Sequence, residues 1–172
     1  EIRLSLVGSE MCIRDRVYLS GGDPVFLTAT LRDTAVWRAI HDAWRAGAAL
    51  AGCSAGAMAL CGEVVDPRNS AREPLAGLGV VPNVRVLPHF DRLAAWVGTA
   101  GMRRLAAALP DVTVLGVDED TALVGGPDVW RVEGRQSVWV IDGGDRRGHP
   151  AGSTLTLPQP TPPTPTPDTT GR

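Results

Sequence analysis

Short apolar runs that end in polar turns recur along the middle of the chain. Aliphatic side chains dominate each run, and a cluster rich in Gly, Pro, Ser or Asp follows it, as is typical of buried strands. The pattern predicts strands over residues 17–20, 48–51, 84–87 and 112–117.

Between these runs, apolar residues fall at helical spacing. Residues 25–46 predict two helices, because Asp33 and Thr34 interrupt the pattern and Thr34 is suited to cap a new helix. Gly47 is expected to end the second of them. Further helices are predicted over residues 55–61 and 93–109.

This alternation predicts an α/β fold with a mainly parallel sheet and helices on both faces. Residues 48–51 are wholly apolar and are expected to form a central strand. Turns rich in Gly, Pro and Asp separate the later apolar runs, which predicts short antiparallel strands near the C-terminus at residues 122–124, 129–132 and 138–141.

The two ends of the chain do not share this pattern. Residues 1–16 have no clean period and resemble translated sequencing-adapter sequence, so they are expected to be non-native, with an ordinary first strand at residues 2–7 as the alternative. Residues 143–172, rich in Pro and Thr toward their end, are expected to be a disordered tail in which His149 is mobile. The folded domain is therefore predicted over residues 17–142, incomplete at its N-terminus.

Composition and charge exclude some classes of partner and site for this protein. The net charge is −2, and the basic residues form no run beside aromatic ones, so neither nucleic acid nor a membrane surface is expected as a partner. The three cysteines have no metal-ligand spacing and are too few for a disulfide scaffold, which predicts a cytoplasmic protein with no metal. No stretch approaches the roughly 20 apolar residues of a membrane span. No cofactor is expected.

The segment Gly52-Cys53-Ser54-Ala55-Gly56 has the pattern of a nucleophile elbow between a strand and a helix. The two glycines are expected because bulky side chains there would collide with the neighbouring strand and helix. Ser54 is the candidate nucleophile, and the Ala55 amide at the helix start is a candidate oxyanion donor. Gly22, in the turn Gly21-Gly22-Asp23-Pro24, is the second candidate donor. Cys53 and Cys61 are interpreted as small buried residues.

A serine nucleophile needs a base, and His89 is the histidine that follows a predicted strand of this domain. The base needs an acid, for which Glu119 in Asp118-Glu119-Asp120 is preferred over Asp66, Glu73 and Asp91. Each motif alone also fits an interpretation without catalysis: a chance Gly-Ser-Gly pattern, a loop histidine and a solvated acidic turn. Their joint placement after three apolar strands favours a serine hydrolase, because open α/β sheets place their sites there.

Together these segments resemble the peptidase E and cyanophycinase family of serine peptidases, which have the class I glutamine amidotransferase-like, flavodoxin-like fold. Along the chain the nucleophile Ser54 comes first, then His89, then the acid Glu119. In α/β-hydrolases the order is nucleophile, acid, histidine. The resemblance implies Ser54 as nucleophile, His89 as base and oxyanion donors near Gly22 and Ala55. For the acid it leaves two alternatives, Glu119 or a residue of the loop after the elbow helix, Asp66 or Glu73. The matching segments are residues 19–24, 47–57, 88–91 and 116–123.

The resemblance further implies cleavage of a small peptide substrate through an acyl-enzyme, at aspartyl dipeptides or β-aspartyl-arginine linkages. The candidate arginines for binding the substrate carboxylate are Arg68, Arg72, Arg85 and Arg92. The oligomeric state stays open, a homodimer included. Family members carry further strands before the Gly21-Gly22 turn, where this chain has the segment expected to be non-native. The alternative to a serine peptidase is therefore a non-catalytic or inactive glutamine amidotransferase-like domain. Amidotransferase activity itself is not expected, because its cysteine would stand where Ser54 stands.

Overall fold

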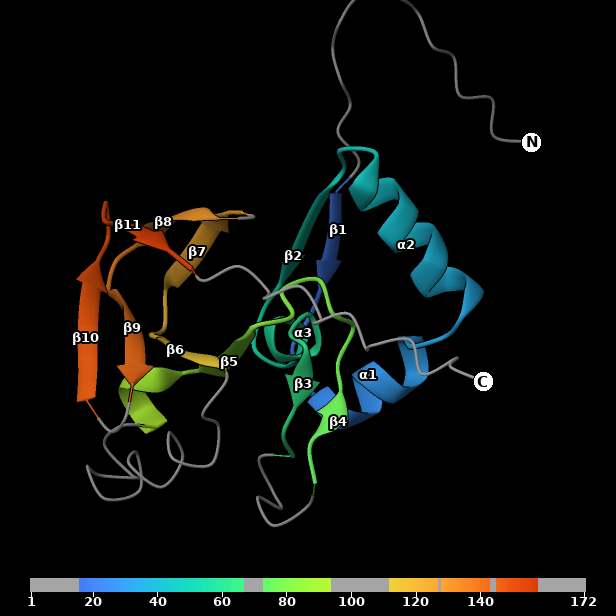
Figure 1. The fold of residues 1–172 in the computed structure, drawn as a ribbon, viewed down its shortest axis with the longest axis horizontal. Coiled ribbons are helices and arrows are strands. Elements are labelled where there is room, and N and C mark those ends of the chain that lie inside the picture. The colour runs from blue at the N-terminus through green and yellow to red at the C-terminus, as the bar shows by residue number, and fades with distance from the viewer. Residues whose placement is uncertain (1–15, 67–72, 94–111, 127, 143–144, 158–172) are drawn as a thin grey trace, which may run out of the picture.

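A computed structural model describes residues 16–66, 73–93, 112–126, 128–142 and 145–157 of the 172-residue chain (Figure 1). The helices in these residues are α1 (Pro24–Leu31), α2 (Ala35–Arg45) and α3 (Ala55–Ala59). The strands are β1 (Arg16–Leu19), β2 (Ala49–Gly52), β3 (Glu63–Val64), β4 (Leu75–Ala76), β5 (Val84–Pro88), β6 (Thr113–Val117), β7 (Thr121–Gly125), β8 (Val129–Gly134), β9 (Ser137–Asp142), β10 (Asp145–Pro150) and β11 (Thr154–Thr156).

The first part of the chain forms a right-hand unit in Figure 1, in which α1 and α2 connect β1 to the parallel strand β2. The predicted helix break is confirmed: Thr34 caps α2 by accepting a hydrogen bond from the Trp37 amide. Gly47 follows α2 with φ +107°, a conformation that favours glycine. Leu19, Trp37 and Leu60 are buried together in the core of this unit.

The later strands form two sheets on the other side of α3 (Figure 1). One has the order β10-β9-β6-β5, in which β5 and β6 are parallel and the other pairs are antiparallel. The second has the order β11-β8-β7 and is antiparallel throughout. A shared core includes Val84, Leu115, Val132, Val138 and Leu155.

The prediction of an α/β fold is confirmed, whereas the mainly parallel sheet with helices on both faces is confirmed only in part, because the described residues form mixed and antiparallel sheets as well. Only β1 with β2 and β5 with β6 pair as parallel strands there, apart from an isolated bridge. After residue 118, short turns join β7 to β8 and β9 to β10, and strands joined by such turns pair antiparallel. The expected antiparallel strands at residues 122–124, 129–132 and 138–141 are confirmed as parts of β7, β8 and β9.

The structure also differs from the prediction that residues 48–51 form a central strand. In the described part of the chain β2 hydrogen-bonds to β1 alone, and Ala49 and Ala51 are exposed. Alanine is small, so its exposure costs little and an alanine run does not distinguish a central strand from a half-exposed one. The helix predicted over residues 93–109 begins at Phe90, and residues 94–111 lie outside the described residues.

The prediction of a disordered tail is wrong for residues 145–157, which contain β10 and β11. Leu155 and Leu157 are each 4% exposed and belong to the core shared by the later sheets. The alternation Thr154-Leu155-Thr156-Leu157 is the period of a half-buried strand, and β8 supplies its partner. His149 lies on β10 and is not in a mobile tail. The Pro/Thr-rich residues 158–172 lie outside the described residues.

Cys53 is exposed, which contradicts its interpretation as a buried residue, whereas Cys61 is buried as predicted. Strand β2 has exposed residues on one face, and Cys53 follows that strand directly. Burial raises the pKa of the Cys61 thiol to about 11. The Cys61 sulfur also donates to the Ala57 carbonyl at 3.4 Å.

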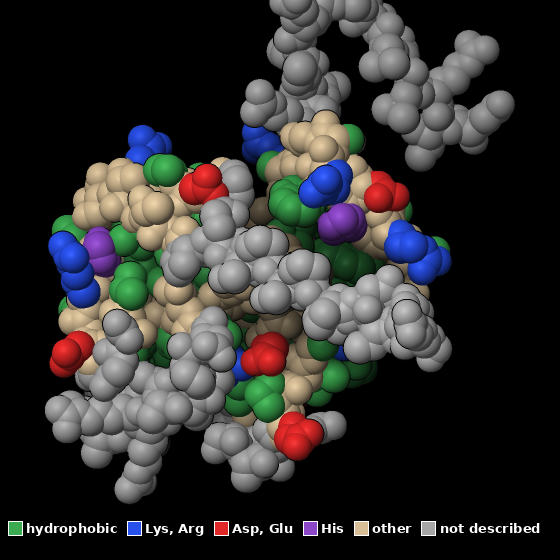
Figure 2. All heavy atoms as spheres, viewed as in Figure 1, with side chains coloured by type: hydrophobic (Ala, Val, Ile, Leu, Met, Phe, Trp, Pro, Cys, Tyr) green, Lys and Arg blue, Asp and Glu red, His purple; other side chains and the backbone are tan. Residues whose placement is uncertain are grey.

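Acidic and basic side chains are interspersed on the face shown in Figure 2, with hydrophobic side chains between them. Among the described residues, none of the helices is both long enough and apolar enough to span a membrane.

We expect Leu155→Ala to destabilise the folded chain by about 2–5 kcal/mol, because it leaves a cavity in a packed core. The matched control is Thr156→Ala, an exposed position on the same strand, which should change stability by less than about 0.5 kcal/mol. Urea unfolding followed by circular dichroism measures both. Equal midpoints for the two variants would mean that β11 is not part of the core.

The two cysteines should differ in reactivity. In a Cys12→Ser background at about pH 8, iodoacetamide should alkylate Cys53 at least about tenfold faster than Cys61, because only the thiolate reacts and Cys61 remains a buried thiol. Mass spectrometry of tryptic peptides measures the two rates. Both residues should react alike in urea, and equal rates in the folded protein would contradict the buried thiol.

Candidate active site

Ser54 occupies a strained turn between β2 and α3. Its backbone angles are φ +51° and ψ −113°, a conformation that costs a residue with a side chain about 1–3 kcal/mol. Hydrogen bonds on either side hold the turn: the Cys53 amide donates to the Leu19 carbonyl at 2.9 Å, and the Gly56 amide donates to the Cys53 carbonyl at 2.8 Å. The strained conformation presents the Ser54 side chain at the end of the strand.

The glycines of the elbow are required by close packing, as the sequence predicted. A Cβ on Gly52 would lie 2.5 Å from the Gly56 carbonyl carbon, at the start of the helix. A Cβ on Gly56 would lie 2.0 Å from the Leu19 carbonyl oxygen, on the neighbouring strand β1. Side chains at either position would therefore push α3 away from the two strands.

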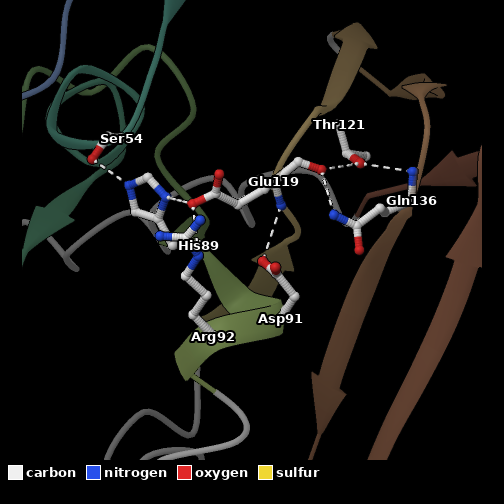
Figure 3. Close-up of polar contacts among 7 residues, drawn as sticks. All are labelled: Ser54, His89, Asp91, Arg92, Glu119, Thr121 and Gln136. Atoms are coloured by element: carbon white, nitrogen blue, oxygen red, sulfur yellow. Dashed lines mark hydrogen bonds and ion pairs between the residues drawn. The ribbon is translucent and has the colours of Figure 1, made fainter.

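His89 and Glu119 converge on Ser54 from two adjacent strands (Figure 3). His89 follows β5 and Glu119 follows the parallel strand β6, so both lie at the carboxyl ends of their strands. The His89 Nε2 atom is 3.0 Å from Ser54 Oγ, and His89 Nδ1 is 2.9 Å from Glu119 Oε1. The structure thus brings the three predicted catalytic residues into one hydrogen-bonded chain.

Local packing explains why His89 points at Ser54. His89 itself has φ +53°, and it immediately precedes the helix that begins at Phe90. The Phe90 ring is 1% exposed and lies over Gly116 of β6, where an added Cβ would be 2.3 Å from the ring. The buried ring fixes the start of this helix against β6, and His89 lies in the turn directly before it.

The acid that contacts His89 is Glu119. Asp91, one of the alternatives, instead accepts a hydrogen bond from the Glu119 amide at 3.0 Å through its Oδ1 atom. Arg92 Nε lies 3.3 Å from Glu119 Oε1, the same oxygen that His89 approaches. The geometry therefore favours Glu119 over Asp66 and Glu73, which lie at the two sides of residues 67–72 after α3.

The candidate oxyanion donors lie beside Ser54. Ala55 is the first residue of α3 and is 1% exposed. Gly22 has φ +134° in the turn between β1 and α1, and its neighbour Gly21 is close enough that an added Cβ would lie 3.5 Å from Ser54 Cβ. A side chain at residue 21 would therefore contact the Ser54 side chain. Their role as donors stays a prediction.

The arginines suggested for substrate binding separate into different environments. Arg85 is 4% exposed and forms an ion pair with Glu63, and burial lowers its pKa. Its buried position and its partner make it a structural residue. The Arg92 side chain is 73% exposed next to Glu119, whereas Arg68 and Arg72 lie outside the described residues. Among the described residues, Arg92 is therefore the candidate whose guanidinium lies next to Glu119.

Two residues at the site were missed by sequence reasoning. Thr121 Oγ1 and Gln136 Nε2 both donate to the Glu119 backbone carbonyl, at 3.1 and 3.0 Å (Figure 3). Thr121 is near Glu119 in sequence, but Gln136 lies in the turn between β8 and β9, and no local motif distinguishes it. No group of three or more His, Cys, Asp or Glu side chains in the described residues is arranged to hold a metal ion.

Comparison with known proteins identifies the family of this chain. The family model of peptidase family S51 matches residues 4–128. The cyanophycinase of Trichormus variabilis is 34% identical over 154 residues, which cover 83% of this chain and 48% of that protein. The cyanophycinase of a Nostoc species is 35% identical over 138 residues, covering 73% of this chain and 44% of that protein. The chain thus spans about half the length of the curated relatives it matches.

A solved structure is also similar. The crystal structure of a peptidase from an acI-B1 actinobacterium superposes with a TM-score of 0.72 at 39% sequence identity, covering 83% of this chain and 59% of that one. The family match begins at residue 4, inside the segment expected to be non-native, and it contains Ser54, His89 and Glu119. The α/β fold, the elbow and these matches lead to one conclusion: this chain belongs to peptidase family S51.

Proposed function

We propose that this chain is a serine-type peptidase domain that cleaves peptide bonds through an acyl-enzyme on Ser54. One observation carries the proposal: the His89 imidazole lies between Ser54 Oγ, at 3.0 Å, and Glu119 Oε1, at 2.9 Å. Hydrogen-bond distances on both ring nitrogens are what a general base and its orienting acid require. The positive φ of Ser54 supports the same role, because backbone strain of this kind clusters at catalytic residues.

The acylation step follows from these contacts. Glu119 accepts a hydrogen bond from the protonated Nδ1 of His89, which keeps Nε2 unprotonated and able to take the proton from Ser54 Oγ. Oγ then bonds to the peptide carbonyl carbon, the carbon–nitrogen bond breaks, and His89 transfers the proton to the leaving amine. Water next attacks the ester, gives a proton to His89 and releases the acid, and Ser54 Oγ regains its proton.

The negative charge that develops on the carbonyl oxygen needs donors. We assign this role to the backbone amides of Ala55 and Gly22, which come from the two segments that flank Ser54. Backbone donors held by packed elements need no reorganisation during the reaction, which is why they contribute strongly to such catalysis. Ala55 is buried at the start of α3, so its position is set by the same packing that strains Ser54.

We propose a small peptide with an acidic group next to the cleaved bond as substrate, either an aspartyl dipeptide or a β-aspartyl-arginine linkage. The relatives named cyanophycinases support the second class. The exposed guanidinium of Arg92 adjoins Glu119 and supplies a positive charge at the edge of the site. With His89 also half exposed, the chain of three residues is accessible from solvent.

The proposal is tested by labelling with a fluorophosphonate probe. The 172-residue chain should incorporate the probe at Ser54, and Ser54→Ala should incorporate none, with unchanged circular dichroism. Mass spectrometry identifies the labelled residue. A folded chain that is not labelled would refute the proposal and favour the inactive or non-catalytic domain.

The identity of the acid is tested by three amide substitutions. Glu119→Gln should slow labelling by about 10²- to 10⁴-fold, because the imidazole loses the carboxylate that orients it and stabilises its charge. The matched controls Asp66→Asn and Glu73→Gln should retain the rate within about threefold. A larger loss in either control than in Glu119→Gln would assign the acid to the loop after α3.

A further inference from the structure

The backbone of Glu119 is held on both sides by side chains from other elements (Figure 3). On one side, its amide donates to Asp91 Oδ1 at 3.0 Å. On the other, its carbonyl accepts hydrogen bonds from Thr121 Oγ1 at 3.1 Å and from Gln136 Nε2 at 3.0 Å. Hydrogen bonds thus hold both the backbone amide and the backbone carbonyl of the residue whose carboxylate contacts His89.

Gln136 makes two of the contacts in this network. Its side-chain amide reaches the Glu119 carbonyl, and its own backbone amide donates to Thr121 Oγ1 at 3.1 Å. Thr121 Oγ1 therefore accepts from Gln136 while it donates to Glu119. The three groups form a closed hydrogen-bonded ring, and removal of the Gln136 side chain opens that ring at its link to the acid.

The turn that carries Gln136 packs directly on the turn that carries the acid. The Arg135 amide donates to the Asp120 carbonyl at 2.9 Å. A Cβ on Gly134 would lie 2.1 Å from the same carbonyl oxygen, so glycine is needed for this approach. The Asp118 amide donates to the Ser137 carbonyl at 3.2 Å. Contacts on both sides of Gln136 set its distance from Glu119.

We propose that Gln136 is a positioning residue for catalysis, which acts through the Glu119 backbone to keep the carboxylate at His89 Nδ1. Gln136 contacts neither His89 nor Ser54 in the described structure, and it lies beyond the residues that the family model matches. The turn between β8 and β9, which connects the two later sheets, accordingly helps to position the catalytic groups. This proposal rests on the proposed function of Ser54, His89 and Glu119.

The physical reason is the steep distance dependence of the hydrogen bond between His89 and Glu119. The peptide that follows Glu119 can rotate if its carbonyl loses a donor, and the rotation moves the side chain that extends from the same residue. A displacement of about 1 Å would lengthen a 2.9 Å contact beyond hydrogen-bond range. Misplacement of this size in an active site can cost about 10²-fold in rate.

The test compares two variants with a matched control on β8, the strand that precedes the Gln136 turn. Gln136→Ala removes the side chain, and Gln136→Glu keeps its shape but replaces the donor with an acceptor. Both should slow fluorophosphonate labelling of Ser54 by about tenfold or more. Glu133→Gln loses a surface ion pair with Arg131 on β8 and should label at the rate of the unmodified chain.

A second background separates positioning from a general structural effect. In Glu119→Gln, which lacks the carboxylate, Gln136→Ala should slow labelling by less than about twofold, because coupled residues are not additive. An equal loss in both backgrounds would mean that Gln136 acts independently of the acid and would overturn the proposal.

A readout that does not depend on activity completes the test. In the NMR spectrum of ¹⁵N-histidine-labelled protein, the His89 Nδ1 proton should give a downfield signal, which is assigned by its loss in His89→Asn. This signal should shift or broaden in Gln136→Ala and stay unchanged in Glu133→Gln. An unchanged signal would refute positioning by Gln136 even if Ser54 is labelled. A chain that is never labelled but loses this signal in Gln136→Ala would refute the proposed function and retain the positioning.

Discussion

The approach of α3 to β1 is the contact on which the site depends. Gly56 lies so close to the Leu19 carbonyl that no side chain fits between them, and Gly52 is equally close to the first turn of the helix. Because the helix starts against both strands, the chain must turn sharply at Ser54, and the residue adopts a positive φ. The energy of that conformation is supplied by the packing of buried neighbours such as Ala59 and Leu60, which belong to the same core as Leu19.

The remainder of the site comes from a different part of the fold. His89 and Glu119 follow the parallel strands β5 and β6, whereas Ser54 follows β2, which pairs with β1 in a separate sheet. Helix α3 packs against β1, β2 and β5, and thereby fixes the distance between the two groups of strands. The hydrogen bond between Ser54 and His89 consequently reports on the packing of α3, because small movements of this helix would separate the two residues.

Charged residues near the site have distinct structural and chemical roles. Arg85 is buried with Glu63 as partner, and isolated burial of its charge would be unfavourable, so the pair belongs to the core. Asp118 is buried one residue before Glu119, where its Oδ2 atom accepts from the Trp139 ring nitrogen at 2.9 Å. Glu119 and Arg92 are more exposed and face the reacting groups. Burial thus distinguishes the charged residues that belong to the core from those that are more exposed next to His89.

Local signals in the sequence were enough for much of this description. The helix break at Thr34, the turn at Gly47 and the elbow around Ser54 each depend on residues close together in the chain, where capping and steric rules apply directly. The order of strands also placed Ser54, His89 and Glu119 after three strands, because chain direction alone determines which residue follows a strand. These features were predicted correctly because no distant partner is needed to define them.

Tertiary structure decided the features that depend on partners far away in sequence. The pairing of β6 with β9 and of β8 with β11 made the later sheets antiparallel and placed Leu155 in the core. The exposure of Cys53 and the choice of Glu119 beside His89 likewise follow from which elements pack together. The sequence by itself determined the elbow at Ser54, while only the fold decided how Gln136 reaches Glu119. Hydrogen bonds between distant turns leave no periodic or local pattern in a chain.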